Sequence, residues 1–498
     1  MTLCRRFFFD TRKHDAAVRE LYGLSEELMM ENAASGLEKA VTEYLEKTEK
    51  KGIVILCGGG NNGADGYALA RRIIWNVTVL ECIPPKSELC TIQAERALKA
   101  GVKIVRGDSC LEYLSSADEN GIAVDCIFGS GFHGELPQDI CGIIDCVNGM
   151  DIFRIACDVP SGLDQFGNCG KSVFTADVTV TMGAQKLCLY SDFAKDACGA
   201  IQVEDLGVTR KLFEDSFEGY SRIEFSLLEE NDMDLPCRKK QNVNKGTFGH
   251  AVTVAGEKSG AAVMASCASL RIGAGLATVV DAVGGCKLDG CTVPCDLMCA
   301  TEFPPNTTAV ACGMGLGRGR DIKGMFDYLK DRDVGCVLDA DLCHYREIKD
   351  LLDSRSKSGA ATVITPHPKE FSMLLENAGL GHHEVQDVVK NRVELAQKFC
   401  SLFPGVVLLL KGATVIICVS DSFGITRMYF NPHGTSALAK GGSGDVLAGL
   451  ICGLLAQKYC AMNAAITGSL VHAFASRKVT PDFTLTPSIL LSSINLPF

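Results

Sequence analysis

Two glycine-rich loops carry the residues of this sequence that are best placed to do chemistry. In the second half of the chain, Gly442, Ser443 and Gly444 directly precede Asp445 at the expected start of a helix. Free N–H groups at such a helix start stabilise negative charge that develops on a phosphate. A neighbouring carboxylate can accept the proton of the hydroxyl that attacks the phosphate. Asp445 is therefore predicted to be a catalytic base; the alternative is a first-turn residue that only stabilises the helix.

The loop in the first half has the sequence GGGNNGADG and follows an expected strand over residues 53–57. It fits the G-x-G-x-x-G dinucleotide fingerprint poorly. Its two asparagines and its aspartate nevertheless supply amide and carboxylate groups for a polyol, an amide or a cation. The structural alternative is a tight turn in which an asparagine adopts left-handed geometry.

Three further loops of the first half also follow expected strands. Asp125 ends one strand before the loop 129–135, a second strand leads into Asp158, and a third leads into Lys186. Ligands of open α/β sheets bind at the carboxyl ends of the strands, so these side chains are expected to converge. His133 fits a surface loop histidine better than a catalytic one.

Loops of the second half repeat this arrangement. Lys411 follows a strand and is expected to meet a nucleotide phosphate or ribose, while the glycines of 313–319 would let a large substrate approach. Prolines on both sides fix the loop of His367, whose alternative role is that of a buried structural histidine. Asp339 and Asp341 suit a polar network or a cation, or else cap the next helix.

Two blocks of apolar runs that alternate with helix-like stretches must position these loops, which favours mostly parallel sheets covered on both faces. A charge-rich segment, 211–240, separates the blocks, so domains are predicted at 1–218 and 225–498. The expected strands are 53–57, 77–83, 122–128, 152–157 and 178–182 in the first block, and 250–255, 278–280, 308–312, 336–338, 362–364, 406–410 and 415–419 in the second.

Composition excludes several classes of protein. The 498 residues exceed the ~100–200 typical of one domain, and the net charge of −11 argues against non-specific nucleic-acid binding. No apolar run approaches the ~18 residues that would span a membrane, and no signal peptide is evident. Twenty-five cysteines without an export signal favour a reducing compartment, the cytoplasm. The cluster Cys286, Cys291, Cys295 and Cys299 fits an edge strand better than a zinc site.

The first block resembles the NAD(P)HX epimerase family, which has a Rossmann-like three-layer sandwich fold and interconverts the R and S forms of hydrated nicotinamide cofactors. The motifs MENAAS, GGGNNGADG, DCIFGSG, CDVPSGLD and TMGAQK carry this resemblance over about residues 10–210. It implies that Asp158 is the acid or base, that Lys186 assists it, and that Asn62, Asp125 and Ser161 ligate a potassium ion. Ala64 departs from the family, which usually has glycine there. The implied substrate-binding residues are Asn61, Asn62, Gly63, Ala64, Asp65, Gly129, Ser130, Gly131, Phe132, His133, Gly134, Glu135 and Asp158.

The second block resembles the NAD(P)HX dehydratase family of the ribokinase-like superfamily, which restores NADH or NADPH from the S hydrate with ADP or ATP and Mg²⁺. Motifs over about residues 240–495 carry it, among them GMGLGRG, VLDADL, TPHPKEF, LKGAT, NPHG and AKGGSGDVLAG. The family usually has other residues at Met314, Lys369, Lys440 and Ser443. The implied contacts are Ala261, Gly315, His367 and Asp445 to the hydrated cofactor, and Lys411, Gly412, Ala413, Thr414, Gly442, Ser443 and Gly444 to the nucleotide.

Together the two resemblances predict a bifunctional repair enzyme that epimerises NADHX and NADPHX and dehydrates their S forms. The expected partners are these small molecules and a second copy of the chain in a homo-oligomer, with neither nucleic acid nor membrane. Two alternatives stay open at this point: a ribokinase-like small-molecule kinase with an appended ligand-binding domain, and a non-catalytic binding protein. The sequence does not decide between ATP and ADP, or between NADHX and NADPHX.

Overall fold

The computed structural model describes residues 5–47, 52–116, 120–217, 223–284 and 293–494. The chain divides into two compact units, residues 6–220 and the part from residue 221 onward. The charge-rich segment 211–240 is not a simple linker, because it contains the end of helix α8 (Arg210–Asp215) and all of strand β10 (Ile223–Leu227). Residue 225, where the second domain was expected to begin, lies inside β10.

The N-terminal unit is built on a parallel sheet in the order β4-β3-β2-β5-β6-β7-β9. Buried apolar residues lie on both of its faces: α2, α3 and α4 pack on one, and α5 and α6 on the other, which makes three layers. The strands are β2 (Gly52–Cys57), β3 (Val77–Glu81), β4 (Lys103–Arg106), β5 (Asn120–Cys126), β6 (Phe153–Cys157), β7 (Val178–Met182) and β9 (Ala200–Glu204). The helices are α2 (Glu26–Leu45), α3 (Asn61–Ala70), α4 (Glu88–Lys99), α5 (Ser109–Ser116) and α6 (Gln138–Asn148).

The strand order of this sheet reverses between β2 and β5. From β2 the chain proceeds outward to β3 and β4, and from β5 it proceeds in the other direction to β6, β7 and β9. The loops that follow β2 and β5 therefore diverge and leave a crevice, which is where open α/β sheets bind ligands. Outside the sheet, α1 (Arg12–Tyr22) precedes α2, and β1 (Arg5–Phe8) pairs with the short strand β8 (Gln185–Lys186).

The C-terminal unit has a sheet in the order β13-β12-β11-β14-β15-β16-β17-β18-β19-β10. It is parallel except at β18, which runs antiparallel to both neighbours. The strands are β11 (His250–Val254), β12 (Leu276–Val280), β13 (Met298–Ala300), β14 (Ala309–Cys312), β15 (Gly335–Leu338), β16 (Thr362–Ile364), β17 (Val407–Leu410), β18 (Val415–Ser420) and β19 (Thr426–Asn431).

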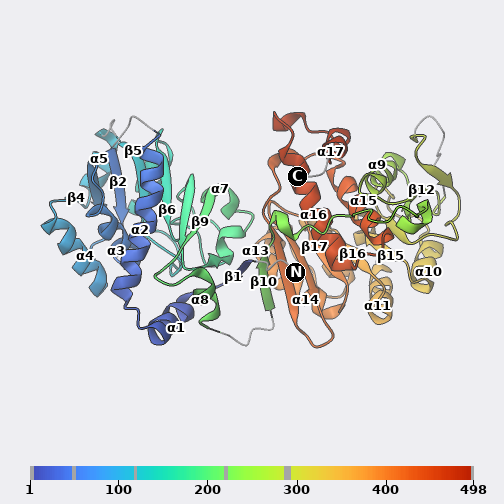
Figure 1. The fold of residues 1–498 in the computed structure, drawn as a ribbon, viewed down its shortest axis with the longest axis horizontal. Helices are drawn as coiled ribbons and strands as arrows, with labels where there is room; N and C mark the ends of the chain where they lie inside the picture. The colour runs from blue at the N-terminus through green and yellow to red at the C-terminus, as the bar shows by residue number, and fades with distance from the viewer. Residues whose placement is uncertain (1–4, 48–51, 117–119, 218–222, 285–292, 495–498) are drawn as a thin grey trace. The chain divides into compact units, whose positions relative to one another are not determined.

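Helix α15 (Ser443–Ala456) lies in the core of this unit, buried from Val446 to its end. It packs beside α9 (Ser259–Arg271) and α16 (Ala461–Arg477) (Figure 1). A Cβ on Gly449 would lie 2.1 Å from the carbonyl oxygen of Ala265 in α9. Only glycine fits there, so the two helices approach each other backbone to backbone.

The described residues bear on the expectations about membrane spans and about the cysteine cluster. Within them, no helix is both long and apolar enough to cross a membrane, and no group of histidine, cysteine and acidic side chains suited to a metal occurs. The edge strand expected at the cysteine cluster is present as β13, and Cys295 and Cys299 are exposed thiols. Cys286 and Cys291 lie outside the described residues.

Candidate active sites

A pocket of about 1000 Å³ opens at the crevice of the N-terminal unit. It brings together most of the residues expected to bind substrate. Gly63 and Ala64 do not line it, since they are buried in the first turn of α3, and the methyl group of Ala64 belongs to the apolar core. Gly134 and Glu135 are exposed and also lie outside the lining. The predicted residues that line it are Asn61, Asn62, Asp65, Gly129, Ser130, Gly131, Phe132, His133, Asp158 and Lys186.

The centre of this pocket holds a buried ion pair. The ammonium group of Lys186 lies 2.6 Å from Oδ1 of Asp158 and donates hydrogen bonds to Oγ1 of Thr181 and the carbonyl oxygen of Met182. The backbone N–H of Ser130 donates to the other carboxylate oxygen, at 3.1 Å. Burial alone would raise the pKa of Asp158, but the charge and the hydrogen bond of Lys186 outweigh it and hold that pKa below its ordinary value. Asp158 is thus an ionised acceptor at the floor of the pocket.

Three charged residues of this pocket were not predicted: Arg12, Asp15 and Lys86. Arg12 and Asp15 come from the first turn of α1, three positions apart and so on one face of the helix. Burial raises the pKa of Asp15 to about 6, and the negative charge of nearby Asp158 adds to the shift. The spacing of Arg12 and Asp15 could have indicated that they share one face of a helix. No motif, however, indicated that this helix would lie over the pocket.

Two of the predicted potassium ligands, Asp125 and Ser161, are in direct contact. Ser161 donates to Asp125 through its hydroxyl and its backbone N–H, both at 2.7 Å, and Asp125 is fully buried. Burial raises the pKa of Asp125 to about 6, which a neighbouring cation would counteract. The side-chain Nδ2 of Asn62 is buried and has no hydrogen-bond partner among the described residues. Since the two ends of an amide are assigned from their partners, this orphaned group can equally present its oxygen, so the residues fit a hard monovalent cation.

In the C-terminal unit, the loops that follow β15, β16 and β17 meet the start of α15. The Lys411 ammonium group lies 2.9 Å from a carboxylate oxygen of Asp339 and 3.6 Å from one of Glu370. It also lies 3.5 Å from where a Cβ of Gly444 would sit, so it faces the glycine loop. Burial alone would lower the pKa of Lys411, but the charges of Asp339 and Glu370 outweigh it and raise that pKa. The lysine therefore stays charged.

Asp445 stands in the first turn of α15, as predicted. Burial raises its pKa to about 6, and the charge of Asp339 adds to the shift. Beneath it, buried His472 contacts the carbonyl oxygen of Ser443 at 2.9 Å through Nε2 and holds the glycine loop in place. The predictions missed His472, which lies in an apolar helix without a motif. Lys440 donates to the carbonyl oxygen of Phe483 at 2.7 Å.

Ala261 and Gly315, both expected to contact the hydrated cofactor, lie side by side. A Cβ on Gly315 would be 3.2 Å from that of Ala261, and the φ of +58° at Gly315 favours glycine. Gly449 of α15 faces Ala265 of α9, and Gly453 faces Ser269, so the two helices run in the same direction. One turn earlier, this register places Asp445 level with Ala261. Ala261 and Gly315 are therefore close neighbours, and Asp445 lies at the matching turn of the adjacent helix. Met314 is fully buried in the apolar core, against which Ala261 also packs.

His367 begins helix α12 (Pro368–Asn377) as its N-cap. Its Nδ1 accepts a hydrogen bond from the backbone N–H of Glu370, whose carboxylate accepts one from the backbone N–H of His367. The side chain is 46% exposed, so the alternative of a buried histidine is wrong. Lys369, in the same first turn, is exposed.

Comparisons with known proteins identify the chain. A family model described as the YjeF-related protein N-terminus matches residues 26–188, and one described as NAD(P)H-hydrate dehydratase matches 251–496. The chain is 38% identical over 480 residues to the bifunctional NAD(P)H-hydrate repair enzyme Nnr of Helicobacter pylori, and the match covers 96% of each. The chain belongs to the bifunctional NAD(P)H-hydrate repair enzyme family.

Other members of the repair enzyme family are more distant. The enzyme of Leishmania major is 28% identical over 482 residues, covering 87% of this chain and 82% of that one. Among solved structures, an ADP/ATP-dependent NAD(P)H-hydrate dehydratase from Bacillus subtilis, co-crystallised with ATP and Mg²⁺, is 23% identical; it covers 53% of this chain and 95% of its own, with a TM-score of 0.42. The prediction of a repair enzyme with an epimerase part and a dehydratase part is confirmed at the level of the family.

Proposed function

We propose that this repair enzyme interconverts the R and S hydrates of NADH and NADPH in its N-terminal unit and dehydrates the S hydrate in its C-terminal unit, with ADP or ATP and Mg²⁺. The observation that carries the proposal is a match to a bifunctional repair enzyme over 96% of both chains. The two sites support it, because each presents an acidic residue in the protonation state that its reaction requires.

For epimerisation, Asp158 would act as the base. The hydrate carries its hydroxyl on C6 next to the ring nitrogen, so inversion requires a bond to C6 to break and re-form. Asp158 would take the hydroxyl proton as the C6–N1 bond opens to an aldehyde and N1 takes up a proton, and the reverse steps on the other face of the aldehyde would give the second epimer. Lys186 keeps the Asp158 carboxylate ionised and oriented, and the backbone N–H of Ser130 fixes the second oxygen. Asn61, Asn62, Asp65 and the loop that includes Phe132 would enclose the ring.

Potassium would be held by Asn62, Asp125 and Ser161, where it would supply positive charge next to the loops that bind substrate. Replacing potassium with tetramethylammonium is expected to lower the exchange between R and S epimers, measured by chromatography of the two forms. Dehydratase turnover in the same solutions is the control for folding. Unchanged exchange would exclude these residues as a functional potassium site.

For dehydration, Asp445 would accept the proton of the C6 hydroxyl as the hydroxyl oxygen attacks the terminal phosphate of the nucleotide and the rest of the nucleotide leaves as ADP from ATP, or as AMP from ADP. Backbone N–H groups of Gly442, Ser443 and Gly444 would stabilise the charge on that phosphate, and Lys411 to Thr414 would contact the nucleotide. Phosphate then leaves C6 and takes up the proton lost from C5, which restores the C5–C6 double bond. Ala261, Gly315 and His367 would position the hydrated ring.

The deciding experiment follows the absorbance at 340 nm of chemically hydrated NADH after addition of the purified chain with ATP, and separately with ADP. Recovery of the absorbance with either nucleotide supports the proposal and identifies the donor. No recovery, together with nucleotide-dependent phosphorylation of a small alcohol, would favour the kinase alternative. A cytoplasmic location fits the free thiols of the described cysteines, and a homo-oligomer stays a prediction.

A further inference from the structure

A second pocket, of about 750 Å³, lies in the C-terminal unit among residues that the proposed reaction has not used. It is formed by residues 318–330, which include helix α10 (Lys323–Asp331), and by residues 344–350, which lead into α11 (Ile348–Ser358). Its size is typical of a small-molecule site. We refer to it as the Arg318 pocket.

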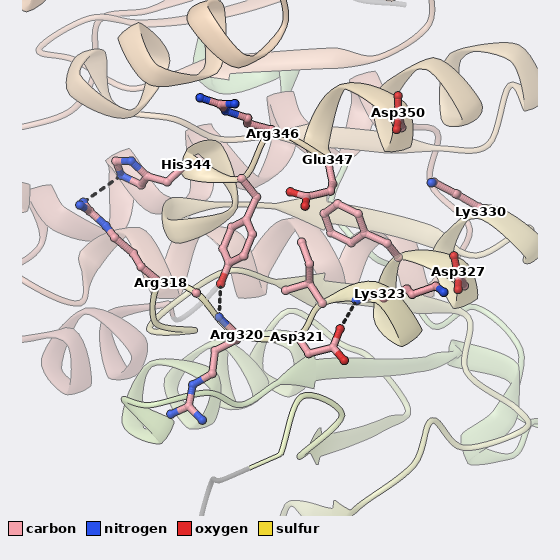
Figure 2. A pocket seen from close by; sticks show the side chains of 14 residues that line it. Arg318, Arg320, Asp321, Lys323, Asp327, Lys330, His344, Arg346, Glu347 and Asp350 are labelled. Carbon is pink, nitrogen blue, oxygen red and sulfur yellow. Dashed lines mark hydrogen bonds between the residues drawn. The ribbon is translucent and has the colours of Figure 1, made fainter.

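The charges of the Arg318 pocket are unevenly distributed. Arg318 lies beside His344 at one end, Arg346 lies next to Glu347, and Lys323, Lys330, Asp327 and Asp350 occupy the other end (Figure 2). Nη2 of Arg318 lies 3.1 Å from Nε2 of His344. Because an arginine only donates, His344 accepts here and is uncharged. The guanidinium of Arg318 is exposed and held by this contact with N–H groups to spare, as is suited to an anion.

The backbone fixes this cationic end to the proposed dehydratase site. Arg318 follows Gly315 in the same loop by three residues. The hydroxyl of Tyr345 donates to the carbonyl oxygen of Gly317 and accepts from the backbone N–H of Arg320, both at 2.9 Å. Asp341 accepts from the backbone N–H of Gly317, also at 2.9 Å. The loop that would contact the hydrated ring is thereby held directly to the pocket wall.

The hydrated cofactor is a dinucleotide, so a ring placed at Ala261, Gly315 and Asp445 must leave its adenosine half and its phosphates elsewhere. We infer that the Arg318 pocket binds a phosphate group of this adenosine half, with Arg318 and Arg346 as its ligands. The inference rests on the proposed function. Two phosphates share this chemistry: the diphosphate, present in both NADHX and NADPHX, and the 2′-phosphate, present in NADPHX alone.

The test is steady-state dehydration of S-NADHX and S-NADPHX by the full chain carrying Arg318→Gln or Arg346→Gln. The matched control is Arg332→Gln, an exposed arginine outside the pocket. We expect KM to rise about tenfold or more with little change in kcat. A rise for both substrates identifies the diphosphate, and a rise for NADPHX alone identifies the 2′-phosphate.

Values of KM for both substrates that match the Arg332→Gln control would overturn the inference, and so would a loss confined to kcat. If the wild-type chain turns over neither hydrate, the proposed function fails, and binding then tests the pocket separately. The probe is ADP-ribose 2′-phosphate, a molecule that carries both the diphosphate and the 2′-phosphate. Its dissociation constant is measured by equilibrium dialysis. Weaker binding to Arg318→Gln than to Arg332→Gln supports the pocket, and equal binding rejects it.

Discussion

The two proposed sites use the same residue types in opposite ways. In the N-terminal unit, Lys186 pairs with the acid proposed to be catalytic, and the pKa of Asp158 falls below its ordinary value. In the C-terminal unit, Lys411 pairs with Asp339 and Glu370 instead, and the pKa of Asp445 rises to about 6. The position of one lysine thus decides whether a half-buried aspartate is permanently ionised or changes protonation near neutral pH.

The largest expected effect is the loss of dehydration, without loss of epimerisation, when Asp445 is replaced. Asp445→Asn keeps the size of the side chain but removes the base, so dehydration is expected to fall by about 10²–10⁴-fold. Exchange between epimers should be unchanged, because Asp158 belongs to the other unit. The measurements are nucleotide-dependent recovery of NADH absorbance and epimer exchange without nucleotide. Near-normal recovery would leave Asp445 as a helix residue only, and loss of both activities would contradict independent sites.

The reciprocal change is Lys186→Met. It leaves the Asp158 carboxylate buried without its cation, so epimer exchange is expected to fall by about 10²-fold or more. Breaking a buried pair also costs roughly 3–5 kcal/mol of folding free energy, which thermal unfolding would show. The control is Lys39→Met, an exposed lysine 3.7 Å from Glu204. Dehydratase activity in the same chain reports whether the C-terminal unit remains folded, and exchange equal to that of the control would remove Lys186 from the reaction.

The pH dependence sharpens the comparison further. Asp445 acts as a base only when ionised, so activity is lost as pH falls through its pKa of about 6. At pH 5 dehydratase kcat/KM should be about one-tenth of its plateau. Asp158, with its lowered pKa, stays ionised there. A dehydratase rate that is constant down to pH 5 would show that Asp445 is not the titrating base.

The last prediction concerns the boundary between the units, where activity should not change and only stability should. Fragments 1–217 and 218–498 should retain epimerase and dehydratase activity respectively, because each unit has its own buried core. A fragment that begins at residue 228 lacks β10, which pairs with β19 at five positions. Its free energy of unfolding should be lower by about 1–5 kcal/mol. Equal denaturant midpoints for the fragments that begin at 218 and 228 would show that β10 is dispensable.

Most of the core could be predicted from the sequence, because buried parallel strands are continuous apolar runs. Strands β7 and β16 have the predicted bounds, and β2 differs by one residue. Among the strands that were not predicted, β4, β9, β10 and β19 have partly exposed residues, so no such run marks them. The α/β class and the family were both confirmed.

The sites could be predicted only where they lie in loops directly after strands. Asp158, Lys186 and Asp445 have motifs around them, whereas Asp15 and His472 reach their sites through helix packing that no local pattern encodes. Ala64 and Met314, which depart from the family, turn out to face the core. Their side-chain direction depends on helix and loop geometry, which the residue type does not reveal.

The close contact between α15 and α9 sets the distance between two parts of the proposed dehydratase site. Ala265 and Ser269 meet glycines 449 and 453 through backbone atoms, and the hydroxyl of Ser269 donates to the carbonyl oxygen of Gly449 at 2.8 Å. The spacing between the helix starts that carry Ala261 and Asp445 is therefore determined by main-chain atoms in the interior rather than by adjustable side chains. This spacing would set how far Asp445, the proposed base, lies from a ring held at Ala261 and Gly315.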